Sequence, residues 1–161
     1  MKQRIKVLAL GIAVAAGASS VALAQVKPED AIRARQSIMR VVALNFGPIA
    51  NMAQDKAPFN KEVVVTNSTR LETLWQMDPS RFFVAGTDRP VPGAKIASFT
   101  DARPEIWSEQ DRFKSAFDKT GQAIVKLAQT AQSGDEQAIK AAAGDVGKAC
   151  KGCHDEFREK Q

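Results

Sequence analysis

The side chains with the most distinctive chemistry lie in the stretch CKGCHDEFR, residues 150–158, close to the end of the 161-residue chain. Cys150 and Cys153 are the only cysteines, and His154 is the only histidine. Residues three apart on a helix share one face, so both thiols would project from the same side with the imidazole beside them. The spacing therefore predicts two sulfur atoms and one nitrogen ligand on a single helical turn.

Three uses of this triplet are disfavoured by the rest of the sequence. A structural zinc site normally takes four Cys or His ligands, and the chain holds three in total, so zinc would need a carboxylate as well. A thioredoxin-like dithiol expects a preceding strand and alternating strands and helices, and neither is visible. A disulfide across two intervening residues would strain a helix and gain little loop entropy.

The pattern Cys-x-x-Cys-His is typical of covalent haem attachment. Cys150 and Cys153 would bond to the two vinyl groups, giving one haem c per chain, and His154 would ligate the iron. Because no second histidine exists, the other axial position is left to a methionine, a weaker donor, an external ligand or nothing. Met39 is the candidate methionine, since it lies one turn after Arg35 on the inner face of a predicted helix, where Arg35 would reach a propionate.

The first 24 residues have the character of a cleaved secretory signal. They begin with three basic residues, continue through an apolar stretch and end in Ala-Leu-Ala. The apolar stretch is shorter than the ~20 residues of a membrane span, and no second one follows. We therefore expect cleavage after Ala24, export to the periplasm and no membrane anchor. Haem c is attached in an export compartment, so this signal and the haem motif agree.

Residues 25–161 are long enough for one domain with a single core. The leader holds three of the 23 Lys and Arg and none of the 18 Asp and Glu, so the rest of the chain is nearly neutral. No basic stripe interleaved with aromatic residues is present, which argues against a nucleic-acid partner.

Helical periodicity marks four segments: about 28–52, 61–77, 108–133, and a fourth that begins after an Asp135 cap. The short run 61–66 also alternates like a strand, and we interpret it as helix. Gly47-Pro48 should bend or loosen the first helix, and the run from Ser108 to Asp111 resembles a capping box at the start of the third. The fourth has its inward positions at alternating steps of four and three: Ile139, Ala143, Val146, Cys150, Cys153 and Phe157.

The long connection 78–107 separates the second and third helices. A connection of this length in a compact domain is uncommon and often functional, although a mobile crossover is an equal alternative for its middle portion. Its last six residues, 102–107, are among the pieces of sequence compared with a known family below.

Six pieces of the sequence, in order, resemble cytochrome c′, the class II c-type cytochromes. They are KPEDAI at 27–32, Arg35-Gln36, Phe46-Gly47, ARPEIW at 102–107, GDVG at 144–147, and residues 150–158. The resemblance implies an all-α, antiparallel four-helix bundle with covalently attached haem near the C-terminus, a fold for which cytochrome c′ is a standard example. The segment 89–96 makes the connection longer than is usual in the family.

The resemblance also implies roles for individual residues. His154 would be the proximal ligand with Arg158 beside it, Arg35 and Gln36 would approach the propionates, and Met39 would block the distal face. The resemblance implies that Met39 does not ligate the iron. The iron would then be five-coordinate and would bind nitric oxide and carbon monoxide. A distal side of Met39, Phe46 and Phe82 or Phe83 offers no hydrogen-bond donor, which disfavours dioxygen. Phenylalanines in such positions are more often core residues than parts of a ligand gate, and Arg158 could be a solvated surface charge.

The primary functional hypothesis is a periplasmic, non-enzymatic haem protein that binds or detoxifies nitric oxide, with possible electron transfer to an unidentified partner. The alternative is a low-spin one-electron carrier in which Met39 is the sixth iron ligand. A peroxidase is disfavoured, because no distal His and Arg pair is available for acid–base work. A homodimer through the first two helices is expected from the family.

Overall fold

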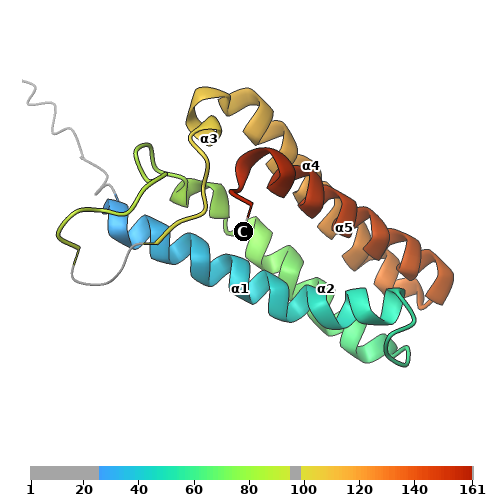
Figure 1. The fold of residues 1–161 in the computed structure, drawn as a ribbon. Coiled ribbons are helices and arrows are strands. Elements are labelled where there is room, and N and C mark those ends of the chain that lie inside the picture. The colour runs from blue at the N-terminus through green and yellow to red at the C-terminus, as the bar shows by residue number, and fades with distance from the viewer. Residues whose placement is uncertain (1–25, 95–98, 161) are drawn as a thin grey trace, which may run out of the picture.

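The fold is a four-helix bundle, shown in Figure 1, and the computed structural model describes residues 26–94 and 99–160. The signal peptide predicted at residues 1–24 lies outside this range. The helices are α1 (Pro28–Ala53), α2 (Lys61–Gln76), the 3-10 turn η1 (Pro79–Phe82), α3 (Glu105–Ser108), α4 (Gln110–Ser133) and α5 (Glu136–Phe157). The expected all-α fold class is confirmed.

The four long helices run alternately in opposite directions (Figure 1). Helix α1 packs against α2 and α5, and α4 packs against the same two helices. None of the described helices combines the length and apolar character that crossing a membrane requires.

The helix ends follow local sequence signals. Pro28 occupies the first turn of α1, where Glu29 and Asp30 oppose the positive end of the helix dipole. The Asp135 carboxylate accepts a hydrogen bond from the Ala138 N–H at the start of α5, as predicted. Gly134 separates α4 from α5 with φ +76°, a left-handed conformation that suits glycine.

One further cap, the short run 61–66 and one proline add to the comparison with the sequence. Asn60, which the periodicity did not single out, caps α2 by accepting from the Val63 N–H. Residues 61–66 are helical, so the ambiguity between strand and helix is resolved as expected. Helix α1 continues through Pro48 to Ala53 without interruption.

The predicted capping box at Ser108 is wrong. Ser108 is the last residue of α3, and α4 begins at Gln110 after Glu109, whose side chain makes no capping hydrogen bond. The reason is that the preceding segment forms its own helical turn, in which the Ser108 N–H bonds to the Pro104 carbonyl. The Ser108 backbone is therefore helical and cannot adopt the extended conformation of an N-cap.

The interior divides into two clusters. One is largely aliphatic and joins all four long helices, with Ile49, Leu71, Ile124, Leu127, Ile139 and Val146 at its centre. The other is aromatic and lies where α3 meets α4 and the end of α5: Ile106, Phe113, Phe117 and Phe157, with Trp75, Phe83 and Trp107 packed against them. Cys150 packs against the first cluster and Cys153 against the second, so the Cys-x-x-Cys segment lies where they meet.

Candidate haem site

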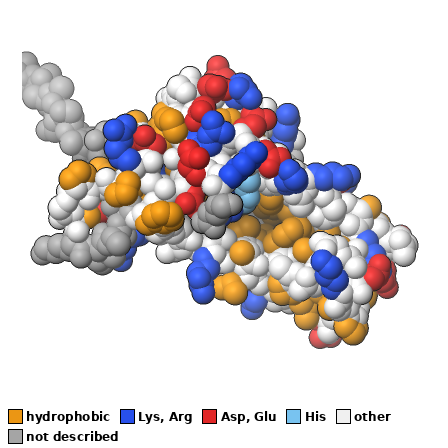
Figure 2. Space-filling model, in the orientation of Figure 1, with side chains coloured by type: hydrophobic (Ala, Val, Ile, Leu, Met, Phe, Trp, Pro, Cys, Tyr) orange, Lys and Arg blue, Asp and Glu red, His pale blue; other side chains and the backbone are white. Residues whose placement is uncertain are grey.

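The bundle contains a cavity of about 500 Å³ bounded by α1, α4, the end of α5 and the connection before α4. Figure 2 shows a hollow lined by hydrophobic side chains beside the single histidine. All eight residues proposed from the sequence line this cavity: Arg35, Gln36, Met39, Phe46, Cys150, Cys153, His154 and Arg158. Tertiary folding thus brings the start of α1 and the end of α5 to one site.

Cys150 and Cys153 are free thiols, each partly exposed to solvent. Burial raises the pKa of Cys150, and burial together with the neighbouring Cys150 and Glu156 raises the pKa of Cys153 to about 11. Reactive dithiols have lowered pKa values, because the thiolate is the nucleophile. This environment therefore does not suit dithiol–disulfide exchange, although it leaves both sulfur atoms accessible from the cavity.

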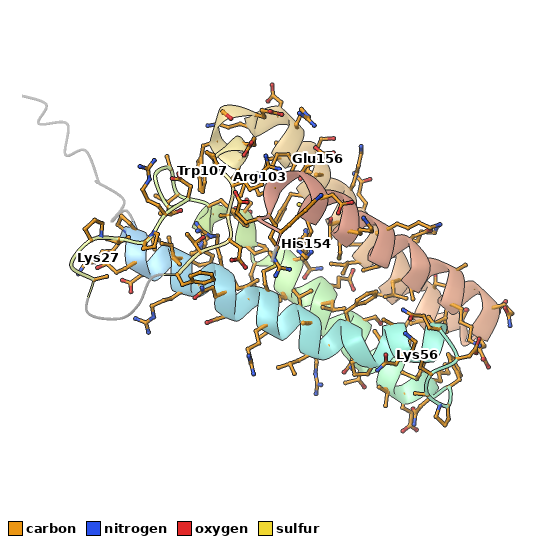
Figure 3. The ribbon with its side chains drawn as sticks, in the orientation of Figure 1. Lys27, Lys56, Arg103, Trp107, His154 and Glu156 are labelled. Atoms are coloured by element: carbon orange, nitrogen blue, oxygen red, sulfur yellow. The ribbon has the colours of Figure 1, made fainter. Side chains whose placement is uncertain are left out.

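His154 lies at the mouth of the cavity, and its side chain points from the last turn of α5 towards α1 (Figure 3). The residue is solvent-exposed, yet the protein around its ring lowers its pKa by desolvation, and the charge of Arg158 adds to this effect. A lowered pKa favours the neutral imidazole, which is the form that ligates a metal. Among the described residues, no three His, Cys, Asp or Glu side chains are grouped to hold a metal ion.

Arg35 is only 6% exposed, and its guanidinium faces the cavity and the long connection together. It donates to the Thr87 hydroxyl and carbonyl, to the Phe82 carbonyl and to the Thr100 hydroxyl. Desolvation lowers the pKa of Arg35 to about 10. The next residue, Gln36, donates its amide to the Phe99 carbonyl.

The apolar wall includes Met39 and Phe46 from α1 and Phe83 from the connection. Phe46 reaches across to α5, where a Cβ atom built at Gly147 would lie 4.0 Å from Phe46 Cζ, an ordinary van der Waals contact. Phe82, the alternative to Phe83, does not line the cavity, because the η1 turn directs its ring to the Arg81 guanidinium, 4.8 Å away.

Arg158 lies just beyond α5 and forms an ion pair with Asp101 at 3.6 Å. Backbone bonds reinforce this contact: Arg103 N–H donates to the Phe157 carbonyl, and Glu159 N–H donates to the Asp101 carbonyl. The end of the connection is therefore fastened to the segment directly after His154.

Several cavity residues were not proposed from the sequence as part of the site. Trp75 lines it from α2, stacked on Phe117 with ring centroids 4.8 Å apart, and Thr120 lines it from α4. An apolar residue on the inner face of a helix is compatible with either core or site, so the sequence pattern alone does not assign these residues to the cavity. Phe99, Thr100, Asp101 and Ala102 complete the wall from the connection. No local signal identifies them, apart from the ARPEIW motif that begins at Ala102.

Known proteins with related sequences share this architecture. Residues 30–158 match the family described as Cytochrome C'. A cytochrome c' from Rubrivivax gelatinosus is 44% identical over 134 residues, which cover 83% of this chain and 98% of that protein. A cytochrome c' from Alcaligenes xylosoxydans xylosoxydans is 38% identical over 135 residues, covering 84% of this chain and 98% of that protein.

Solved structures agree with the sequence relatives. The crystal structure of the Rubrivivax gelatinosus protein superposes with a TM-score of 0.73, covering 83% of this chain and 98% of that one. The nitric oxide complex of a mutant of cytochrome c prime from Alcaligenes xylosoxidans superposes with a TM-score of 0.70 at 38% identity, covering 84% and 98%. The chain described here therefore belongs to the cytochrome c′ family.

Proposed function

We propose that this chain carries one haem c, bonded through Cys150 and Cys153 and ligated by His154, and that its iron binds nitric oxide and carbon monoxide. The observation that carries the proposal is the convergence of all eight sequence-proposed residues on one cavity. The family and the complete Cys-x-x-Cys-His motif support the same cofactor.

The residues present fit a haem. A cavity of about 500 Å³ lies within the range of cofactor pockets, roughly 300–1,000 Å³. Its wall is mostly apolar, with the two cysteines and His154 along one side. When bound, the haem would supply an iron able to bind a diatomic gas. His154 would hold that iron from the α5 side, while Met39 and Phe46 would exclude water on the α1 side.

Arg35 and Gln36 would approach the haem propionates. Arg35 is a buried cation whose four hydrogen-bond acceptors are all neutral oxygens. A buried charge is costly unless it is paired, so a propionate near the guanidinium would offset this cost. Arg158 would lie on the His154 side, held there by Asp101.

Selectivity for nitric oxide over dioxygen would follow from the cavity wall. Met39, Phe46 and Phe83 have no hydrogen-bond donor in their side chains. The Thr120 hydroxyl also lines the cavity, but it donates its proton to the Ala116 carbonyl at 3.0 Å. Solved relatives include nitric oxide complexes of cytochrome c prime from Alcaligenes xylosoxidans. We infer a carrier or scavenger of nitric oxide, acting in the periplasm after removal of residues 1–24.

A second candidate function has its own supporting observation. Met39 lines the same cavity as His154 but from α1, so its sulfur would be available as a sixth ligand. A six-coordinate, low-spin iron would favour one-electron transfer over gas binding.

Optical spectra of the purified ferric and ferrous protein, with and without nitric oxide, test both candidates. We expect a high-spin spectrum that changes when the gas is added, and a haem that stays with the polypeptide after denaturation. A low-spin spectrum indifferent to nitric oxide would favour electron transfer. Replacing both cysteines by serine is the control, since the haem should then be lost on denaturation.

A further inference from the structure

Arg35 holds the long connection against α1. We call the described part of this connection, residues 82–94 and 99–103, the strap. Every hydrogen bond given above for the Arg35 guanidinium reaches the strap, at Phe82, Thr87 and Thr100. The guanidinium also lies over the Phe83 ring, with its central carbon 5.2 Å from the centroid. Residues separated by 47 to 65 positions are therefore joined by one side chain.

Thr87 is the centre of this arrangement. It is fully buried, at 0% exposure, although it belongs to a connection between helices. Gly86 precedes it with φ +77°, a conformation that turns the chain inward at low cost only for glycine. The Thr87 hydroxyl accepts from Arg35 and donates to the Val84 carbonyl at 2.6 Å, while the Thr87 carbonyl accepts from Arg35 at 2.7 Å.

The strap also forms part of the cavity wall. Phe83, Phe99, Thr100, Asp101 and Ala102 all line the cavity, together with Arg35 itself. The far end of the strap is fixed independently to the end of α5 by the backbone bonds of Asp101 and Arg103. A change at Thr87 would therefore alter the cavity rim through Arg35 while leaving the second attachment intact.

We propose that Thr87 is a positioning residue for the haem site, because its hydroxyl fixes the Arg35 guanidinium and, through it, the strap against the cavity. Two consequences follow. The Arg35 charge stays beside the cavity, where a cation favours the reduced state of a nearby redox centre. The rim formed by the strap stays closed, which limits the rate at which a gas enters. Both consequences rest on the proposed haem function, whereas the fastening of the strap does not.

Thr87→Val and Thr87→Ser, made in the haem-loaded full chain, separate the hydroxyl from the shape of the side chain. In the valine variant, both hydrogen bonds of the hydroxyl are lost, one from Arg35 and one to Val84. We expect backbone amides in residues 82–94 to exchange hydrogen at least about five-fold faster, since the loss of even one hydrogen bond of ordinary strength implies this change. The reduction potential should fall, and carbon monoxide should bind the ferrous protein faster. Serine should restore all three properties. Thr73→Val, on the exposed face of α2, is the control and should change none.

Two results would contradict the role proposed for Thr87. Native exchange and an unchanged potential in Thr87→Val would overturn it, as would a serine variant that behaves like the valine variant. If Thr87→Val does not fold, Thr100→Val removes a longer Arg35 contact of 3.3 Å, and the same measurements then decide. If the wild-type ferrous protein binds no carbon monoxide, the proposed gas-binding function fails, while the exchange comparison still tests the role of Thr87.

Discussion

At the scale of single residues, Met39 separates the two proposed functions. It lies partly buried on α1, lines the cavity and packs against the aromatic cluster. An apolar Met39 that only fills space would leave an axial position open, whereas a ligating sulfur would close it. The same side chain in the same place thus supports gas binding or electron transfer, depending on one bond.

Replacing Met39 by leucine should leave the ferric spectrum and the nitric oxide response unchanged. Leucine and methionine have similar volumes, so the swap should cost less than about 1.5 kcal/mol of stability. Met77→Leu is the matched control, since Met77 is 67% exposed and outside the cavity. Conversion of a low-spin to a high-spin spectrum in Met39→Leu alone would identify Met39 as a ligand and reject the five-coordinate proposal.

Gly121 illustrates how a small residue shapes the site from outside it. A Cβ atom at this position would lie 2.6 Å from Cδ1 and Nε1 of Trp75. The Trp75 ring is stacked on Phe117 and forms part of the cavity wall. Gly121 therefore lets α2 and α4 approach closely enough for Trp75 to lie flat.

Gly121→Ala should destabilise the protein by about 1–3 kcal/mol, the usual cost of overpacking a core. Unfolding in urea, followed by circular dichroism, would measure this loss. Gly144→Ala is the control, because Gly144 is exposed on α5 with nothing within 4 Å, and alanine there should stabilise the helix by about 0.5–1 kcal/mol. Equal stability of Gly121→Ala and wild type would mean that the Trp75 ring moves freely.

At the scale of the elements, α5 is held by α4 on one side and by the strap at its end. The α4–α5 contact includes an ion pair between Lys126 and Asp145 at 3.0 Å. The hydrogen bond from Lys126 lowers the pKa of the Asp145 carboxyl below its ordinary 3.8. A group whose pKa is lowered on folding stabilises the protein above its unfolded pKa, and this contribution is lost as the pH falls through its folded pKa.

Asp145→Asn should therefore be slightly less stable than wild type at neutral pH. The difference should disappear well below about pH 4, where the wild-type carboxyl is protonated and uncharged, as the asparagine amide always is. The effect should be small and should weaken at high salt, because both side chains are solvent-exposed. Urea unfolding across the pH range would show it. Lys126→Met and the double variant complete a mutant cycle, and additive effects of the two changes would show that the pair contributes nothing.

At the scale of the whole molecule, α1 and α2 leave apolar side chains in contact with solvent. Val41 and Leu44 on α1 are 45% and 66% exposed, and Val63 on α2 is 36% exposed. Exposed apolar residues on a helix face are common at protein interfaces. We propose on this ground a homodimer through these two helices, which the family resemblance also implies.

Leu44→Glu should convert this dimer to a monomer, because the carboxylate would lose its hydration in an apolar interface. Sedimentation velocity at micromolar concentration would distinguish the two states. Lys119→Glu, on the exposed surface of α4, also changes a charge but should leave the dimer intact. Sedimentation of the wild-type protein as a monomer would contradict the proposal directly.

Features that depend on neighbours within a few residues could be predicted from the sequence. The spacing of Cys150, Cys153 and His154, the Asp135 cap and the Gly134 helix end are all local, because helix geometry and capping act over about four residues. The pieces resembling cytochrome c′ added the fold class. The prediction of a capping box at Ser108 was wrong for a local reason as well. Ser108 belongs to the helical turn α3, so its backbone could not take the N-cap conformation.

Contacts between residues far apart in the chain could not be predicted, because they form only when the helices pack. Arg35 and Thr87 are 52 positions apart, and nothing near either one indicates that Thr87 is fully buried or that Arg35 fastens a connection. The contact of Trp75 with Gly121 likewise exists only once α2 and α4 have packed. Such contacts depend on the path of the whole chain, so the sequence could nominate the ligands of the site, while the packing of the bundle decided its walls.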